Sequence, residues 1–243
     1  MYKSFDGVKA VDDFSLSLQP GKLTSLIGPN GGGKTTVFNI LTGFLQSSGG
    51  EILFKNSSIT GFSPWKIARL GISRTFQDIR LFKKMTLLEN VLLGRKDQQG
   101  ENILAALFTF REESQEHRQH IEKALSLLEF VGLAGQKNEL AENLSYGQQK
   151  LLSIACCLAT DPELLLLDEP VAGVQPAMIE KIVTILKELV SQQKKTVLLI
   201  EHHIDFVLGI SDIVVVMDEG KKIAEGEPGG IKNRPDILEA YLS

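Results

Sequence analysis

The chain has 243 residues, 43% of them hydrophobic, which is enough to bury the core of one large α/β domain. Its net charge of −4 and scattered basic residues argue against a nucleic-acid binder. No apolar run approaches the roughly 20 residues that span a bilayer, and Met1–Gly7 lacks the apolar core of a signal peptide. The only cysteines, Cys156 and Cys157, are adjacent in an apolar helical stretch, which disfavours a disulfide or metal site and fits a reducing cytoplasm.

The first predicted elements are strands. Asp13–Leu18 and Lys22–Ile27 have strand patterns, and Gly49-Gly50 followed by EILFK indicates a hairpin partner. A helical pattern then begins at Lys34 and continues to Leu41.

A glycine-rich loop, GPNGGGKT, joins the second of these strands to the helix. Its glycines let backbone N–H groups converge on phosphate, and the helix N-terminus adds roughly half a positive charge. Lys34 is expected to reach the β- and γ-phosphates, Thr35 to complete the coordination of Mg²⁺, and Thr36 to contact the α-phosphate. The alternative is a glycine-rich turn beside an ordinary surface lysine. The predicted phosphate-binding residues are Gly28, Pro29, Asn30, Gly31, Gly32, Gly33, Lys34, Thr35 and Thr36.

The middle of the chain changes character. Ile72–Phe76 is predicted as a strand, and the pattern becomes helical from about Leu88 to Val131. The motif LSYGQQ then precedes an apolar helical stretch, Leu151–Leu158. A serine hydroxyl at a helix N-terminus suits an anion, although Ser145 could equally serve only to cap the helix.

The motif LLLLDEP supplies two acids. Glu163–Leu167 is an apolar run typical of a strand buried on both faces, and it ends at Asp168 and Glu169. Asp168 can hold the water shell of Mg²⁺, while Glu169 can polarise the water that attacks the γ-phosphate. Two exposed acids that merely end a strand are the alternative. Beyond them, the pattern predicts a helix from Met178 to Leu189 and strands at Thr196–Ile200 and Ile213–Met217.

With GPNGGGKT, LSYGQQ and LLLLDEP in this order, the chain resembles the ATP-binding-cassette family over nearly its full length. These are the nucleotide-binding subunits of ABC transporters. The resemblance implies a single α/β domain of P-loop type, residues 1–243, with a mostly parallel RecA-like core sheet, an antiparallel β subdomain and a helical signature subdomain. Residues 1–87 and 160–243 would form the core and β lobe, and residues 88–159 the helical lobe.

The resemblance also implies residue roles in ATP hydrolysis. LSYGQQ is similar to the signature motif, in which Ser145, Gly147 and Gln148 would close over the ATP of a second, head-to-tail cassette. Gln77 resembles the glutamine that touches Mg²⁺ and links the nucleotide to the membrane partner, although a surface glutamine is the alternative. His202 resembles the switch histidine that contacts the γ-phosphate.

Other positions leave questions open. Phe5 lies where the family places an aromatic residue against adenine, although a phenylalanine near a terminus can instead be a core residue. The family usually has a further strand before this aromatic residue, whereas only four residues precede Phe5, so we expect one sheet edge to be thinner. Gly32, Gln175 and Cys156 stand where relatives usually carry Ala or Ser, Asp and Arg, and the effect of the last two departures is not predicted.

Within the family, the chain most resembles the ATPase subunits of branched-chain amino-acid importers. The stretches behind this are ISRTFQDIRLFKKMTLLENV, LSYGQQ, IEHHIDFVLGISD and the tail AEGEP…NRPDILEAYLS. The resemblance implies separate transmembrane permease subunits, a second cassette that is either identical or related, an indirect periplasmic or extracellular binding protein, and a cytoplasmic location on the inner face of the membrane. The alternatives are a cassette for urea or lipopolysaccharide, a cassette ATPase of DNA repair or translation, and a P-loop kinase.

The amphipathic segment Gln77–Val91 follows the predicted Mg²⁺-linked glutamine. The family docks a helix of the membrane subunit there, so we expect a docking surface. A packed interdomain helix is the alternative.

Overall fold

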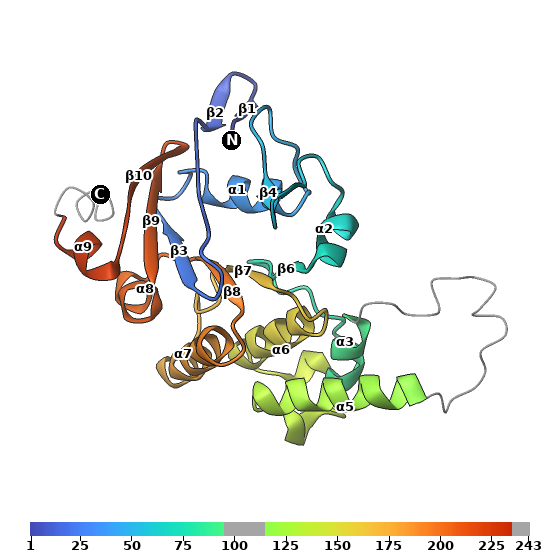
Figure 1. Ribbon diagram of the computed structural model, residues 1–243. Coiled ribbons are helices and arrows are strands. Elements are labelled where there is room, and N and C mark those ends of the chain that lie inside the picture. The colour runs from blue at the N-terminus through green and yellow to red at the C-terminus, as the bar shows by residue number, and fades with distance from the viewer. Residues whose placement is uncertain (95–114, 235–243) are drawn as a thin grey trace, which may run out of the picture. The chain divides into compact units, whose positions relative to one another are not determined.

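The computed structural model describes residues 1–94 and 115–234 (Figure 1). The middle of the predicted helical region, residues 95–114, and the tail stretch 235–243 lie outside the described residues. The chain forms two compact units. The first comprises Met1–Gln77, Glu163–Ala172 and Leu186–Ser243, and the second comprises Asp78–Pro162 and Gly173–Ile185.

The first unit is built on a six-stranded sheet with the order β10-β9-β3-β8-β7-β6. Strands β9, β3, β8, β7 and β6 are parallel, whereas β10 pairs antiparallel with β9. Central strands of a parallel sheet are covered on both faces, which explains the uninterrupted apolar runs predicted there. The strand bounds are β3 Leu23–Ile27, β6 Ile72–Arg74, β7 Leu164–Asp168, β8 Thr196–Ile200, β9 Ile213–Asp218 and β10 Lys221–Gly226.

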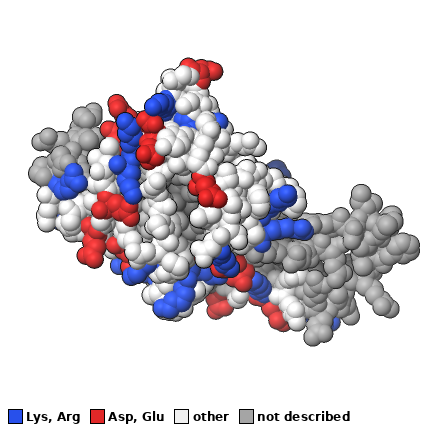
Figure 2. All heavy atoms as spheres, turned by 45° about the horizontal axis from the view of Figure 1, so that its top comes forward, with Lys and Arg blue, Asp and Glu red and all other residues white. Residues whose placement is uncertain are grey.

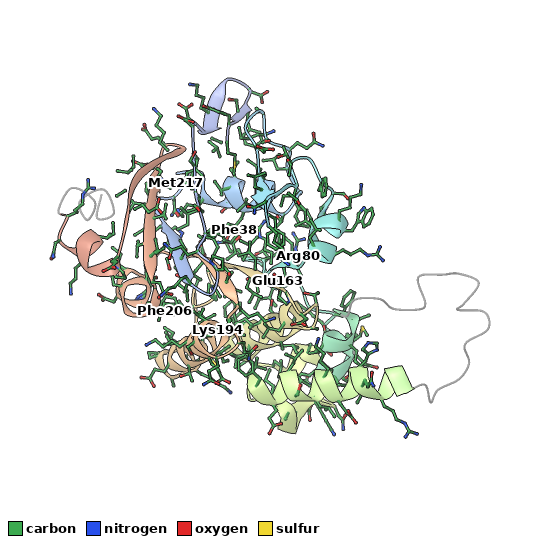
Figure 3. All side chains as sticks on the ribbon, in the orientation of Figure 1. Phe38, Arg80, Glu163, Lys194, Phe206 and Met217 are labelled. Atoms are coloured by element: carbon green, nitrogen blue, oxygen red, sulfur yellow. The ribbon has the colours of Figure 1, made fainter. Side chains whose placement is uncertain are left out.

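Two short antiparallel hairpins complete the strands of this unit: β1 (Lys3–Phe5) pairs with β2 (Val8–Val11), and β4 (Leu53–Phe54) pairs with β5 (Ser57–Ser58). Its helices are α1 (Lys34–Leu41), α2 (Pro64–Leu70), α8 (Ile204–Ile210) and α9 (Pro228–Lys232). Phe38 of α1 and Met217 of β9, both labelled in Figure 3, belong to the core beside the sheet. Neither side chain is exposed.

The second unit is helical. Helices α3 (Leu87–Leu93), α5 (Gln115–Phe130) and α6 (Tyr146–Leu158) pack on one another. Ala124 and Leu128 of α5 are buried. Two short 3₁₀ turns, η2 (Ala134–Gln136) and η3 (Ala141–Asn143), connect α5 to α6. Helix α7 (Pro176–Ser191) begins in this unit, and its last residues belong to the first.

The strand prediction for Asp13–Leu18 is wrong. Asp13 has a left-handed φ of 53°, which bends the chain out of an extended path. Phe14 then exchanges backbone hydrogen bonds with Met1, at 3.0 and 3.1 Å, and buries its ring in the core. The alternation of apolar residues in this stretch therefore reflects core anchoring and no ladder.

The other element predictions need smaller corrections. The strand predicted to reach Phe76 ends at Arg74, and EILFK pairs with Ser57–Ser58. Within the amphipathic segment Gln77–Val91, helix begins only at Leu87. Thr86 explains the boundary, since it and Glu89 form a capping box.

Acidic and basic side chains are interspersed over the face drawn in Figure 2. Among residues 1–94 and 115–234, no helix has both the length and the apolar character needed to cross a lipid bilayer.

Candidate active site

The glycine-rich loop lies between β3 and α1, as predicted. All five residues of β3 are buried, and helix α1 starts at Lys34 directly after Gly33, which caps it with a left-handed φ of 102°. The loop therefore leaves the carboxyl end of a central parallel strand and enters a helix N-terminus. In open α/β sheets, this end of the strands is where ligands bind.

Two of the glycines are required by close backbone packing. A Cβ atom on Gly28 would lie 1.8 Å from the carbonyl oxygen of Met217, and one on Gly33 would lie 2.3 Å from that of Ala10. Gly32 has less room than its place in relatives, usually Ala or Ser, would require, because an added Cβ would meet the carbonyl oxygens of Pro29 and Met217 at 3.1 and 3.2 Å. The loop therefore packs closely against β9, and there is little room for a side chain at Gly28, Gly32 or Gly33.

Lys34 is 5% exposed, and its Nζ donates hydrogen bonds to the carbonyl oxygens of Gly28 (2.7 Å) and Pro29 (2.8 Å). Burial lowers the pKa of Lys34, while the nearby carboxylates of Glu169, Asp168 and Asp218 oppose this shift. The amine thus lies inside the loop, where a bound phosphate would meet it. Thr35 is exposed and Thr36 half-buried.

Asp168 ends β7 and is 2% exposed. Its Oδ2 accepts a hydrogen bond from Nη2 of Arg74 at 2.7 Å, and its backbone N–H donates to Oγ1 of Thr75. Its other carboxylate oxygen, Oδ1, is buried with no hydrogen-bond partner among the described residues. A buried carboxylate oxygen without a donor suits a cation or its water shell, so the donor set fits Mg²⁺.

Arg74 is itself held on several sides. Its Nη1 donates to Oδ1 of Asn39 at 2.6 Å, and the guanidinium lies 5.3 and 5.0 Å from the ring centroids of Phe38 and Phe76. This packing fixes the direction in which the guanidinium presents its N–H groups.

Glu169 receives the side chains of two residues that are distant in the sequence. Nε2 of His202 lies 3.0 Å from its Oε1, and Nε2 of Gln77 donates to its Oε2 at 3.1 Å. The first unit therefore brings together the ends of β7 and β8 with the segment that follows β6. All three residues were predicted as site residues from the sequence.

The backbone of Glu169 is also unusual. Its φ of 48° is left-handed, which costs a non-glycine residue roughly 1–2 kcal/mol. Its N–H donates to the carbonyl oxygen of Ile200 at 2.9 Å, and its own carbonyl accepts from Ala172. Strain that the surroundings hold in place is frequent at functional sites.

The signature segment lies in the second unit. Ser145 caps α6: its hydroxyl accepts from the N–H of Gln148, and the Gln148 side chain accepts from the N–H of Ser145. An added Cβ on Gly147 would lie 2.9 Å from Cγ of Met178, so a side chain at this position would have to displace that methionine. The capping alternative is thus realised in the structure, and a role of Ser145 toward ATP stays a prediction.

Three other positions singled out from the sequence, Phe5, Gln175 and Cys156, are exposed or half-buried. Phe5 ends β1 with 45% of its surface exposed, and Nζ of Lys3 lies 5.0 Å from its ring centroid. Gln175 is exposed, and its backbone carbonyl accepts the first hydrogen bonds of α7. Cys156 is half-buried in α6.

Two residues of this site escaped the sequence-based prediction, Arg74 and Glu201. Glu201 follows β8 directly, is 2% exposed, and accepts hydrogen bonds from the backbone N–H groups of Val171 and His202. The available signal was a charged residue inside or next to a buried apolar strand, which is rarely tolerated without a partner.

Comparison with known proteins identifies the family. Residues 11–172 match the ABC transporter family. The chain is 42% identical over 238 residues to the high-affinity branched-chain amino acid transport ATP-binding protein LivG of Escherichia coli K12, covering 98% of this chain and 93% of LivG. It is 44% identical, with the same coverage, to BraF of Pseudomonas aeruginosa, which carries the same description.

Solved structures agree. A nucleotide-free ATP-binding cassette from an ABC transporter superposes with a TM-score of 0.86 at 36% identity, covering 100% of this chain and 96% of that one. The ADP conformation of the cassette MJ1267 gives a TM-score of 0.84 at 36% identity with the same coverage. The dimeric cassette MJ0796 gives 0.76 at 26% identity, covering 93% and 95%. These similarities agree with the glycine-rich loop and the paired acids Asp168 and Glu169. The chain belongs to the ABC transporter family and is one of its ATP-binding, ATP-hydrolysing cassettes.

Proposed function

We propose that this chain is the ATPase subunit of an importer for branched-chain amino acids. It would work at the inner face of the cell membrane, bound to transmembrane permease subunits, with a periplasmic or extracellular binding protein delivering the cargo to those subunits. The relatives named for branched-chain amino acid transport, matched over almost the whole chain, support the cargo class. The proposal includes one nucleotide-binding domain with a helical lobe at about residues 88–159.

The observation that carries the catalytic proposal is the convergence of Gln77 and His202 on the carboxylate of Glu169. A carboxylate in this position can act as general base toward a water molecule, and a histidine beside it can donate to the γ-phosphate. The strained backbone of Glu169 and its bond to Ile200 keep the carboxylate at the carboxyl edge of the sheet.

The phosphate loop and the acids have complementary tasks. The backbone N–H groups of Gly28 and of residues 30–36, together with the amine of Lys34, would hold the phosphates, and Phe5 would stack on adenine. Thr35, Asp168 and Gln77 would hold Mg²⁺ directly or through its waters, and the ion would neutralise charge between the phosphates. Oδ1 of Asp168, which has no hydrogen-bond partner within residues 1–94 and 115–234, is available for this task.

The site would be completed by a second cassette in a head-to-tail pair. Ser145, Gly147 and Gln148 of that cassette would face the γ-phosphate, and loss of this phosphate would remove the contacts that keep the pair closed. The second cassette can be a copy of this chain or a related one.

Light scattering tests the pairing. Glu169→Gln should bind ATP but hydrolyse it slowly, so Mg²⁺-free ATP should double its mass. A mass that stays monomeric in this variant, even at saturating ATP, would contradict self-pairing and would point to a different partner cassette.

Cargo is tested with permeases. Reconstituted with branched-chain permease subunits and their binding protein, the cassette should show ATPase activity that rises when leucine is added. ATPase activity that rises with urea, or with the subunits of a lipopolysaccharide transporter, and not with leucine would overturn the cargo class. Phosphate release that required an added small-molecule acceptor would instead favour a kinase.

A further inference from the structure

Glu201 is a buried carboxylate between two functional segments. It lies between β8 and His202, and only 2% of it is exposed. Its Oε1 accepts the backbone N–H of Val171 at 3.0 Å, and its Oε2 accepts the backbone N–H of His202 at 3.1 Å. Each oxygen therefore holds a different stretch of backbone.

The two stretches carry the two residues that meet at the proposed site. Val171 lies two residues after Glu169, and His202 follows Glu201 directly. The side chains of Glu169 and His202 are 3.0 Å apart. The carboxylate of Glu201 thus links the two backbone segments that carry Glu169 and His202.

A carboxylate is needed for both bonds. Two separate N–H donors point at two separate oxygens, and an ionised carboxylate accepts at both, whereas an amide offers one oxygen and one NH₂ group. Burial raises the pKa of Glu201, and the backbone N–H groups of Val171, His202 and His203 oppose that rise. Burying an acid in this way is unfavourable without such donors, so the donors and the carboxylate hold one another in place.

We propose that Glu201 is a positioning residue for ATP hydrolysis. It joins the loop after Glu169 to the backbone of His202 and so sets the distance between the side chains of Glu169 and His202. The inference rests on the proposed roles of those two residues. Glu201 acts through the positions of Glu169 and His202.

The test is steady-state phosphate release by Glu201→Gln. Because one of the two bonds must be lost, kcat should fall about tenfold while the KM for ATP changes less than about twofold. In the background of His202→Ala, the same substitution should lower kcat by a clearly smaller factor than in the unmodified protein, since one of the two residues that Glu201 positions is gone. Equal losses in both backgrounds, or an unchanged kcat, would overturn the inference.

Asp212→Asn is the matched control. Asp212 also fixes backbone, since its Oδ2 accepts the N–H of Leu23 at 2.8 Å, but at the amino end of β3. The Asp212→Asn variant should have a lower melting temperature and an unchanged kcat per folded molecule. If Glu201 had only a structural role, Glu201→Gln would show the same two results.

Two further readouts separate the possible failures. If Glu201→Gln does not fold, hydrogen exchange on the unmodified protein decides: the amides of Val171 and His202 should exchange as slowly as those of β8, and exchange at the rate of exposed loops would contradict the bridge. If Glu169→Gln keeps normal turnover, the proposed base is wrong. If Glu169→Gln releases phosphate slowly but Glu201→Gln releases it at the normal rate, Glu169 remains the proposed base and only the positioning role of Glu201 is wrong.

Discussion

Arg74 donates from Nη2 to Oδ2 of Asp168 at 2.7 Å, and the two side chains are 5% and 2% exposed. Removing one partner of a buried pair leaves an uncompensated charge, which costs about 3–5 kcal/mol. We therefore expect Arg74→Met to lower the free energy of unfolding by about this amount in urea denaturation.

The double variant Arg74→Met with Asp168→Asn is the control. It removes both charges, so it should recover part of the lost stability. A single variant as stable as the unmodified protein would show that the pair contributes nothing.

The glycine loop predicts a position-specific effect of alanine. Gly28→Ala should prevent native folding, because the new Cβ would lie 1.8 Å from the carbonyl oxygen of Met217. A Cβ on Gly31 would have no atom of the described residues within 4 Å, so Gly31→Ala should cost only the strain of its left-handed φ of 81°, about 1 kcal/mol. Soluble yield and melting temperature measure the difference. Equal behaviour of the two variants would contradict the described path of the loop.

The thiols should be unreactive in the folded protein. Burial raises the pKa of Cys157 to about 12 and also raises that of Cys156, so the neutral thiol is favoured far above neutral pH. An ordinary cysteine has a pKa of about 8.5, so at pH 8 the folded protein should react with DTNB at least about a hundredfold more slowly than the unfolded chain. Reaction at the unfolded rate would contradict the pKa shift.

Phe82 offers a test of membrane-subunit docking. It lies in the irregular segment before α3, and 61% of it is exposed. Since little burial is lost, Phe82→Asp should keep the soluble ATPase activity but weaken co-purification with the permease subunits at least about tenfold. Leu93→Asp, at a second exposed apolar residue of the same unit, is the matched control. Normal assembly of the Phe82 variant would remove this segment from the docking surface.

The sequence predicted the elements that have uninterrupted apolar runs. Strands β3, β7 and β8 are buried throughout or nearly so, which makes their pattern legible without any knowledge of their neighbours. The hairpin of β1 and β2 was missed, although its turn residues Asp6 and Gly7, both with positive φ, form the Asp-Gly pair typical of a two-residue turn. Its strands are too short and too exposed for a period to emerge.

The site was predicted unevenly for a similar reason. Lys34, Asp168 and Glu169 lie in contiguous motifs, whereas Arg74 and Glu201 have meaning only through partners on other strands. The bond from Arg74 to Asp168 spans 94 positions, and that from Val171 to Glu201 spans 30. Sheet order creates both contacts, and no local pattern encodes it.

Glu169 is the proposed base for ATP hydrolysis, and phosphate release by Glu169→Gln is the measurement that decides this role. With saturating ATP and Mg²⁺, the variant should release phosphate at least about a hundredfold more slowly than the unmodified protein, while its ATP affinity stays within about threefold. Glu163→Gln, at the exposed residue directly before β7 (labelled in Figure 3), should leave the rate unchanged. A Glu169→Gln variant that binds ATP and releases phosphate at a near-normal rate would contradict the account.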